Sequence, residues 1–240
     1  MKSMIHASII VITFLLFPSC IGYVGNSITG NGNVTTEYRE VGSFHGIEAS
    51  AGLKVFVIFG EMRGEVEVVA DENLHEHIIV EVDNEILKIR SRRNIRNASS
   101  KDIFVKAGEI DELEVSSAAR LIGENVLITD NIDIEVSSAA ELDLNLEANS
   151  IHIEVSSSGS ANMEGSVFKL IADVSSAGDL DAYQLIAEEG NIEASSAADA
   201  KVHITGKLKA AASSAGSIRY EGNPGLKETD SSSAGSISAR

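Results

Sequence analysis

From about residue 111 onward, apolar and polar residues alternate on both sides of a short run of small residues. Each run opens with Ser-Ser, and the first serines are Ser116, Ser137, Ser156, Ser175, Ser195, Ser213 and Ser232, at steps of 21, 19, 19, 20, 18 and 19 residues. Positions one and three before each first serine, and five and seven after it, are mostly apolar. A period of two indicates β-strands. A nearly constant repeat length indicates a solenoid. We therefore predict stacked coils of about 19 residues, each with a strand, a tight corner, a second strand and a turn.

The corner is built from residues with almost no side chain. The third residue after the first serine is always Ala or Gly: Ala119, Ala140, Gly159, Gly178, Ala198, Gly216 and Gly235. A corner stacked on an identical corner leaves little room, and glycine would also permit a positive φ there. Serine hydroxyls are expected to bond to backbone in the corner or in the next coil. No histidine recurs at a fixed distance from the serines, so we interpret the run as architecture and not as a catalytic nucleophile.

Residues 37–110 lack the full repeat but continue the alternation. They contain a degraded corner at Ser50-Ala51-Gly52, a hairpin turn at Asp83-Asn84, and a short helical turn that Asp71 could cap. An end coil otherwise exposes its core and its strand edges. The sequence therefore predicts an N-terminal β-rich capping region over 37–110 and a Ser-Ser-Ala repeat solenoid over 111–240.

The first twenty residues have the pattern of a targeting segment. One charge at Lys2 precedes an apolar run from about Ile5 to Phe17, which is too short for a membrane span and typical of a signal peptide. Ser19-Cys20 resembles a lipoprotein cleavage site, so we predict a signal peptide over 1–19 and lipidation of Cys20. Residues 20–36, rich in Gly, Asn, Ser and Thr, then predict the lipidated cysteine and a flexible tether. Cys20 is the single cysteine of the chain, which rules out an internal disulfide.

The charge balance narrows the classes of partner. The chain has 36 Asp and Glu against 19 Lys and Arg, for a formal net charge of −17. Nucleic acid requires a basic surface, so we expect no nucleic-acid partner. With no Trp and few other aromatic residues, platforms for stacking bases or sugars are expected to be scarce.

One polar position of the repeat is nearly always acidic. Two residues before the first serine stand Glu114, Glu135, Glu154, Asp173 and Glu193, with a gap at Ala211 before Asp230. In stacked coils these carboxylates would form an outward ladder with a spacing of about 4.8 Å. The ladder is either a solvated face that discourages edge pairing, or a row of sites for Ca²⁺. No other cofactor is expected.

Two further groups of polar residues invite a functional interpretation. Arg90, Arg92, Arg93 and Arg96 form a basic cluster, which either balances nearby acids or contacts an anionic glycan or lipopolysaccharide. His75-Glu76-His77 has the alternation of a metal-binding pair but no third ligand, and we interpret it as a surface pair.

Three stretches resemble the GIN-domain family, whose members are described as auto-transporter adhesin heads and are often lipoproteins of Bacteroidota. They are "FHGIEASAGLKV" at 44–55, the "LKI" strand at 87–89 and the recurrent "SSAGSI" at 213–218 and 232–237. The resemblance covers about residues 38–240. It implies an all-β fold with a right-handed parallel β-helix, and it transfers no catalytic residues.

We therefore predict a lipid-anchored protein of the outer membrane that is not an enzyme. Its leading role is a non-catalytic adhesin or binding module that presents a rigid solenoid face to a glycan or protein ligand. The alternative is a periplasmic structural or sensing lipoprotein, because no acidic cluster follows Cys20; the sequence leaves the cell surface and the periplasmic face undecided. A polysaccharide-active β-helix enzyme is less favoured. Such an enzyme would need acidic and basic side chains together on neighbouring coils, and few basic residues lie near the Asp residues that could serve as its acids. The open edge of the last coil could also pair two copies of the chain.

Overall fold

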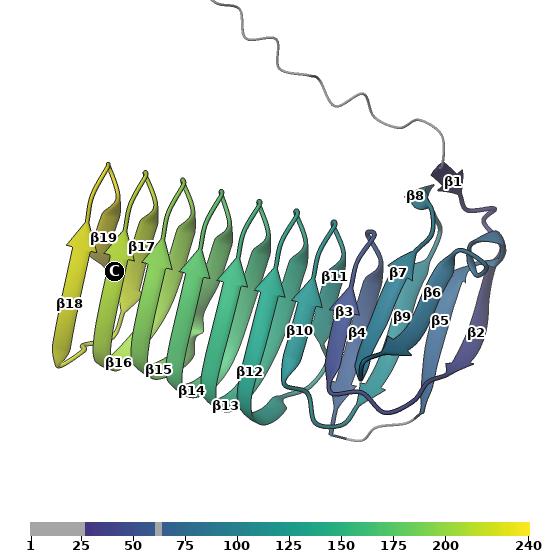
Figure 1. The fold of residues 1–240 in the computed structure, drawn as a ribbon, viewed down its shortest axis with the longest axis horizontal. Helices are drawn as coiled ribbons and strands as arrows, with labels where there is room; N and C mark the ends of the chain where they lie inside the picture. Colours follow the sequence, from purple (N-terminus) through teal and green to yellow (C-terminus); the bar gives the residue numbers. More distant parts are fainter. Residues whose placement is uncertain (1–26, 61–63) are drawn as a thin grey trace, which may run out of the picture.

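The computed structural model describes residues 27–60 and 64–240, so the predicted signal peptide and Cys20 lie outside the described residues. The described chain is nearly all β, with nineteen strands and one short 3-10 turn. The coils stack along the long axis of the molecule, and a cap covers the end formed by the earlier residues (Figure 1). No helix within the described ranges is long and apolar enough to cross a membrane.

The predicted solenoid is confirmed as a stack of parallel strands in register. Its strands are β10 (Glu112–Val115), β11 (Arg120–Gly123), β12 (Leu127–Val136), β13 (Glu141–Val155), β14 (Ser160–Val174), β15 (Asp179–Ala194), β16 (Asp199–Ala212), β17 (Ser217–Glu221), β18 (Leu226–Ser231) and β19 (Ser236–Ala239). Strands β13 to β16 each run from one Ser-Ser corner, round the opposite bend, to the next corner. Equivalent repeat positions lie opposite each other, as Val136, Val155 and Val174 do.

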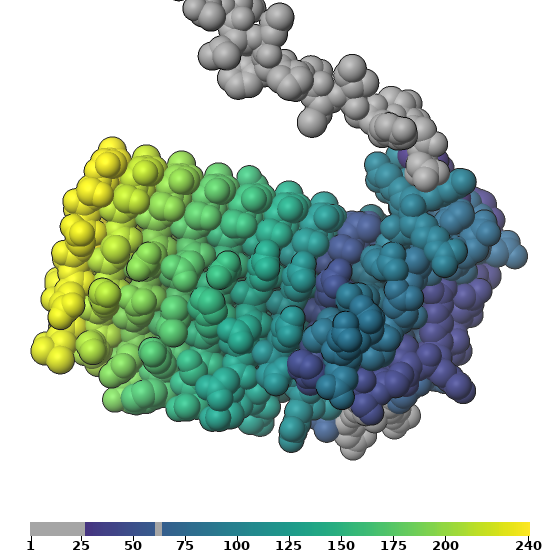
Figure 2. All heavy atoms as spheres, in the orientation of Figure 1, coloured from purple at the N-terminus to yellow at the C-terminus, as the bar shows by residue number. Residues whose placement is uncertain are grey.

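The alternating apolar residues form one continuous core. The positions that the repeat predicted to face inward are nearly fully buried, including Leu113, Val115 and Leu121 in the first repeat coil. The same positions in later coils, such as Ile153 and Leu180, are equally buried. The coils pack against one another without gaps along the visible face of the solenoid (Figure 2). Each coil therefore buries its apolar surface against its two neighbours, which a single coil could not do alone.

Each corner is a tight turn in which two consecutive residues have a positive φ. In the first corner these are Ser117, at 52°, and Ala118, at 59°, and the amide of Ala119 donates to the carbonyl of Ser116. The same pair of positions is left-handed in all seven repeat corners. The amide of Ala118 also donates to the carbonyl of Ser138 at 3.0 Å, so the hydrogen bonds between coils continue through the corner.

This geometry corrects two expectations about the corner. The Ala or Gly position is buried in six of the seven corners and half-buried in the last, but its glycines do not adopt a positive φ. At Gly159, an added Cβ would lie 2.6 Å from the carbonyl oxygen of Val136, so the position is small for lack of space. Among the described residues, no corner serine hydroxyl makes a hydrogen bond within the protein; backbone amides bond the corners instead.

Replacement of Ala177 by glycine is expected to stabilise the protein. Ala177 is exposed and has a φ of 60°, a conformation that costs an L-residue about 1–2 kcal/mol. Glycine removes this cost, but its greater backbone entropy in the unfolded chain offsets part of the gain. We expect the free energy of unfolding in urea to rise by about 0.5–1 kcal/mol. Ala148→Gly, in an ordinary strand position of β13, is the control and should lower it. Equal losses in both variants would contradict the assigned strain.

The solenoid stacking extends into the first half of the chain. Strands β3 (Gly46–Ala49) and β4 (Lys54–Phe59) pair in parallel with β10 and β11, and the degraded corner between them has positive φ at Ala51 and Gly52. Strands β7 (Ile86–Ser91) and β9 (Lys101–Ala107) then pair in parallel with β3 and β4 on the outer side. Residues 46–59 therefore lie between two later segments, and parallel pairing is continuous across residue 111.

Antiparallel strands close this end of the stack. Strand β5 (Glu65–Asp71) pairs with β9, β2 (Val34–Glu40) pairs with β5, and β6 (Ile78–Asp83) pairs with β7. The predicted hairpin turn joins β6 to β7, with positive φ at Asn84 and Glu85. The 3-10 turn Glu72–Leu74 places Leu74 in the core, with none of its surface exposed. These elements confirm a β-rich cap that covers the core.

Two local predictions for the cap are corrected. The flexible tether was predicted to reach residue 36, but β1 (Ser27–Thr29) pairs with β8 (Asn94–Asn97) and β2 begins at Val34. Asp71 occupies the N-cap position of the 3-10 turn without making a side-chain cap bond. Its buried carboxylate instead accepts hydrogen bonds from the amides of Gly32, Ser99 and Ser100. Burial alone would raise the pKa of Asp71, but these bonds outweigh it and lower the pKa.

Candidate functional site

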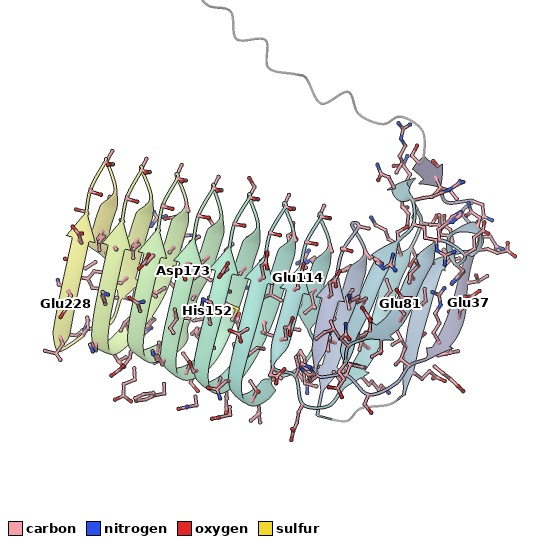
Figure 3. The ribbon with its side chains drawn as sticks, viewed as in Figure 1. Glu37, Glu81, Glu114, His152, Asp173 and Glu228 are labelled. Atoms are coloured by element: carbon pink, nitrogen blue, oxygen red, sulfur yellow. The ribbon has the colours of Figure 1, made fainter. Side chains whose placement is uncertain are left out.

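The predicted acidic ladder exists as a continuous row. Glu114, Glu135, Glu154, Asp173 and Glu193 lie opposite one another in successive parallel strands. Figure 3 shows Glu114 and Asp173 on the same face of the solenoid. The row extends one strand further to Glu48, which lies opposite Glu114. Sequence analysis missed Glu48 although it stands two residues before Ser50, because the corner that follows it is degraded.

A lysine marks the cap end of this row. Lys88 on β7 lies opposite Glu48, with 3.9 Å between its Nζ and the Oε2 of Glu48. The same Nζ donates to Asp83 at 2.8 Å, and this bond is the main cause of a raised pKa for Lys88. Lys88 thus offsets charge at the cap end of the row, and farther along the coils His152 is the basic side chain that lies within 3.9 Å of its carboxylates among the described residues.

The crowding of carboxylates has a measurable consequence at Glu114. Burial, followed by the charges of Glu48 and Glu135 on the neighbouring strands, raises the pKa of Glu114 above its ordinary value of 4.5. A carboxyl group with a raised pKa binds its proton more tightly in the folded state. Its contribution is therefore most favourable in acid and is lost as the pH rises through the raised pKa.

Glu114→Gln is accordingly expected to stabilise the protein at pH 7 by up to about 1 kcal/mol, the size of one like-charge contact near 4.8 Å in water. The gain should shrink as the pH falls toward 4.5, where the wild-type side chain gains its proton. Urea unfolding at both pH values measures this difference. Glu147→Gln is the control, because its neighbours in register, Ile128 and Ser166, carry no charge. A gain that is independent of pH would contradict the assigned cause.

Shallow grooves follow the acidic row. One of about 320 Å³ is lined by carboxylates of three coils and by His152. The Nδ1 atom of His152 lies 3.2 Å from Asp133, and its Nε2 atom lies 3.5 Å from Asp173. No group of three or more side chains of the types that bind metals is arranged to hold an ion within the described residues. The Ca²⁺ sites considered from the sequence stay a prediction.

The arginine cluster is divided between two environments. Arg90 pairs with Glu81 of the adjacent strand, at 2.5 Å. Arg92, Arg93 and Arg96 are exposed at the end of β7 and on β8, and no ion pair involves them among the described residues. Because β8 pairs with β1, this exposed basic surface lies beside the first described residues of the chain. Of the four arginines, only Arg90 therefore balances a nearby acid in the part of the chain that the structure describes.

The histidine pair is not a surface pair. His75 is buried, with 6% of its surface exposed, and its Nε2 atom lies 3.0 Å from the hydroxyl of Thr35. Its Nδ1 atom lies 3.3 Å from the carboxylate of Glu37. The segment is a turn that follows the 3-10 helix, so the two-residue alternation of a strand does not apply. His75 therefore contributes to the packing of β2 against the cap.

An aromatic groove on the cap was not anticipated from the sequence. It has a volume of about 570 Å³, and its lining includes Tyr38, Phe56, Ile58, Glu67 and Phe104. Three of these side chains are large and exposed: Tyr38 at 62%, Ile58 at 45% and Phe104 at 40%. The signal was present in "KVFVIF" and "IFVKA", where outward strand positions are apolar as well as inward ones. Three of the eleven aromatic residues of the chain, Tyr38, Phe56 and Phe104, thus meet in one groove, although stacking platforms were expected to be scarce.

The comparisons with known proteins agree with this architecture. The model of a family described as "Putative auto-transporter adhesin, head GIN domain" matches residues 43–224. No curated protein matches the chain. A crystal structure of a "putative adhesin" from Bacteroides fragilis is similar, with a TM-score of 0.82, 21% identity, and coverage of 89% of this chain and 100% of that one.

Two structures from Parabacteroides are similar as well. A "putative adhesin" from Parabacteroides merdae has a TM-score of 0.71 at 18% identity, covering 90% of this chain and 99% of that one. A "putative lipid binding protein" from Parabacteroides distasonis has a TM-score of 0.70 at 21% identity, covering 89% of this chain and 99% of that one. At these identities the likeness shows a common fold.

Proposed function

The chain belongs to the family of auto-transporter adhesin heads that carry the GIN domain, and from this premise we propose that it is a lipid-anchored, non-catalytic adhesin of the cell envelope. In this proposal Cys20 carries the lipid, and six residues separate it from β1 in the sequence. Six residues of any chain reach at most about 20 Å, so the cap would lie close to the outer membrane. The solenoid would present its faces to a glycan or protein ligand.

The observation that carries the binding role is the repetition of outward-facing carboxylates in register. On the face of the acidic row, equivalent carboxylates recur on six successive strands of the stack: β3, β10, β12, β13, β14 and β15. A rigid array of this kind can engage several equivalent groups of an extended ligand at once, which raises the overall affinity without any single strong contact. The pKa of Glu114 is raised first by burial and then by the charges of Glu48 and Glu135, which the same close spacing brings near.

The cellular location is tested by a tag at the C-terminus, probed with antibody and protease on intact cells of the native host. Accessible tag on intact cells is the expected result. A tag that is protected until the outer membrane is broken would overturn adhesion and favour the periplasmic structural or sensing role. Replacement of Cys20 by serine should release the protein from the membrane fraction if the cysteine carries the lipid.

The contact surface is tested by removal of three ladder charges together. The triple variant Glu135→Gln, Glu154→Gln and Asp173→Asn should reduce attachment of cells or purified protein to immobilised glycans and matrix proteins. The triple variant Glu147→Gln, Glu164→Gln and Glu188→Gln removes the same charge outside this row and is the matched control. Attachment at the wild-type level by both variants would exclude the ladder as the contact surface. An equal loss of attachment in both variants would mean that net charge alone controls attachment.

A further inference from the structure

The aromatic groove on the cap is built on four neighbouring strands. Phe56 on β4 lies opposite Phe104 on β9, and their rings stack with centroids 4.9 Å apart and planes inclined by 8°. Phe104 lies opposite Glu67 on β5, and Glu67 lies opposite Tyr38 on β2. The four side chains thus form one row across the outer face of the cap. A carboxylate stands between two exposed aromatic residues in this row.

The groove already has a cation on one of its rings. The Nζ atom of Lys54 lies 4.5 Å from the centroid of Phe56. A cation at this distance is attracted by the negative face of the ring. At the other end of the stack, Phe104 has Glu67 as its neighbour in register and is 40% exposed. The outer part of the groove therefore offers an aromatic surface and a carboxylate together.

The dimensions and charge of this outer part select the occupant. One strand, β5, lies between Phe104 on β9 and Tyr38 on β2, so the two residues are two strand spacings apart, about 9.6 Å. A flat group in contact with both side chains needs about 7–8 Å. The lining carries Glu65, Glu67 and Glu124 against Lys106, and Lys54 lies over Phe56 at the far end of the row. The three carboxylates still outnumber the two lysines, so the groove favours a positively charged occupant. A guanidinium is flat, stacks on aromatic rings and donates paired hydrogen bonds to a carboxylate.

The floor of the groove is fixed by the fold. The side-chain amide of Asn125 donates to the carbonyl of Phe59 at 2.8 Å and accepts from its amide at 2.7 Å. The amide of Glu124 donates to the carbonyl of Val57 at 2.8 Å. These bonds hold β4 against the loop that follows β11. Ligand binding here would consequently order few backbone groups, which lowers its entropic cost.

We propose that this groove binds the guanidinium group of an arginine side chain presented by a partner protein. The guanidinium stacks on the exposed face of Phe104 toward Tyr38, and its N–H groups donate to the carboxylate of Glu67. This inference deepens the proposed binding role, on which it rests, by assigning it a ligand chemistry. It also places a specific contact on the cap, apart from the acidic row of the solenoid.

The test is a titration of the full mature protein with acetyl-Gly-Arg-Gly-amide, followed by NMR of backbone amides. Saturable shifts are expected in β9, β5 and β2. The citrulline peptide, which has the same shape without the charge, should bind about tenfold more weakly, because neutral hydrogen bonds are weaker than charge-assisted ones. Equal binding of both peptides would overturn the proposal. Shifts at the same strands with methyl pyranosides, and none with arginine, would show a sugar site instead.

Variants separate the groove from the general attraction of an acidic protein for cations. Phe104→Leu keeps the net charge and should weaken arginine binding about fivefold through loss of the cation–π contact. Glu67→Gln should weaken it at least as much, while Glu147→Gln, with the same charge change on the solenoid, should leave it unchanged. Equal effects of Glu67→Gln and Glu147→Gln, or no effect of Phe104→Leu, would overturn the proposal. Thermal unfolding checks that each variant is folded.

Peptide binding is measured without cells, so its outcome is distinguishable from that of the proposed function. A protein that binds the arginine peptide but is protected inside intact cells would retain the groove as a ligand site and lose the adhesin role. A surface-exposed adhesin that ignores the peptide would lose the groove as a ligand site alone.

Discussion

A Gly165→Ala variant is expected to lose about 3 kcal/mol or more of its free energy of unfolding, because two costs act at one position. Gly165 has a φ of 114°, which side chains of L-residues rarely adopt. A Cβ atom there would also lie 2.0 Å from the carbonyl oxygen of Leu146 in the coil next to it. That oxygen belongs to a buried backbone at the bend opposite the corners, so neither coil can move aside without loss of the pairing between β13 and β14.

Gly225→Ala is the matched control, since it adds the same methyl group to the solenoid. Its φ is not positive, and the atom nearest to an added Cβ is 3.9 Å away. Its stability should stay within about 0.5 kcal/mol of the wild type. Urea unfolding followed by circular dichroism gives both values. If both variants lost similar amounts of free energy of unfolding, the positive φ and the nearby carbonyl oxygen would not explain why position 165 is a glycine.

The register of the solenoid could be predicted because one repeat fixes three properties together. The inward positions, the corner and the coil length all follow from alignment of the copies on Ser116 and its equivalents. Once parallel coils stack, the same alignment places Glu114 beside Glu135. The acidic row therefore follows from the repeat alone, and its extension to Glu48 follows once the degraded corner at Ser50 is counted as a copy.

The order of the cap strands could not be predicted in the same way. The chain places β3 and β4 first, then β7 and β9 on their outer side, and then returns to β10 on their inner side. Nothing in the local pattern distinguishes this order from simple succession, because every strand offers the same alternation to either neighbour. The aromatic groove depends on that order, since it brings Phe56 and Phe104 together from strands that are distant in sequence.

Corner geometry was misjudged for a different reason. Glycine at one position of the run suggested that the positive φ would lie there, but the hydrogen bond from Ala119 to Ser116 requires a tight turn whose two central residues are Ser117 and Ala118. Stacked corners stabilise these strained residues through bonds such as that from Ala118 to Ser138. The strain is compensated between coils, and a sequence pattern within one coil carries no trace of it.

Deletion of residues 156–174 is expected to give a folded protein with one coil fewer. The deletion joins Val155 to Ser175, and in the native structure Val155 already lies opposite Val174, the residue that precedes Ser175. Every later residue therefore keeps its place relative to its new neighbour, and Ile192 stacks on Ile153 where Ala172 lay between them. Scattering should show a rod shorter by about 4.8 Å, and unfolding should remain cooperative.

Deletion of residues 156–173 removes one residue fewer and should abolish the fold of this region. Val155 then precedes Val174, so the strand before the corner is displaced by one position, and a one-residue shift moves each side chain to the other face. Either Glu154 and His152 enter the core, or the corner leaves its stack. Burial of unpaired polar groups costs several kcal/mol for each group, and two such groups approach the whole stability of a typical domain, about 5–15 kcal/mol. Cooperative unfolding of both deletion variants would contradict this expectation. It would show that a coil of suitable length stacks regardless of which alternating side chains face the core.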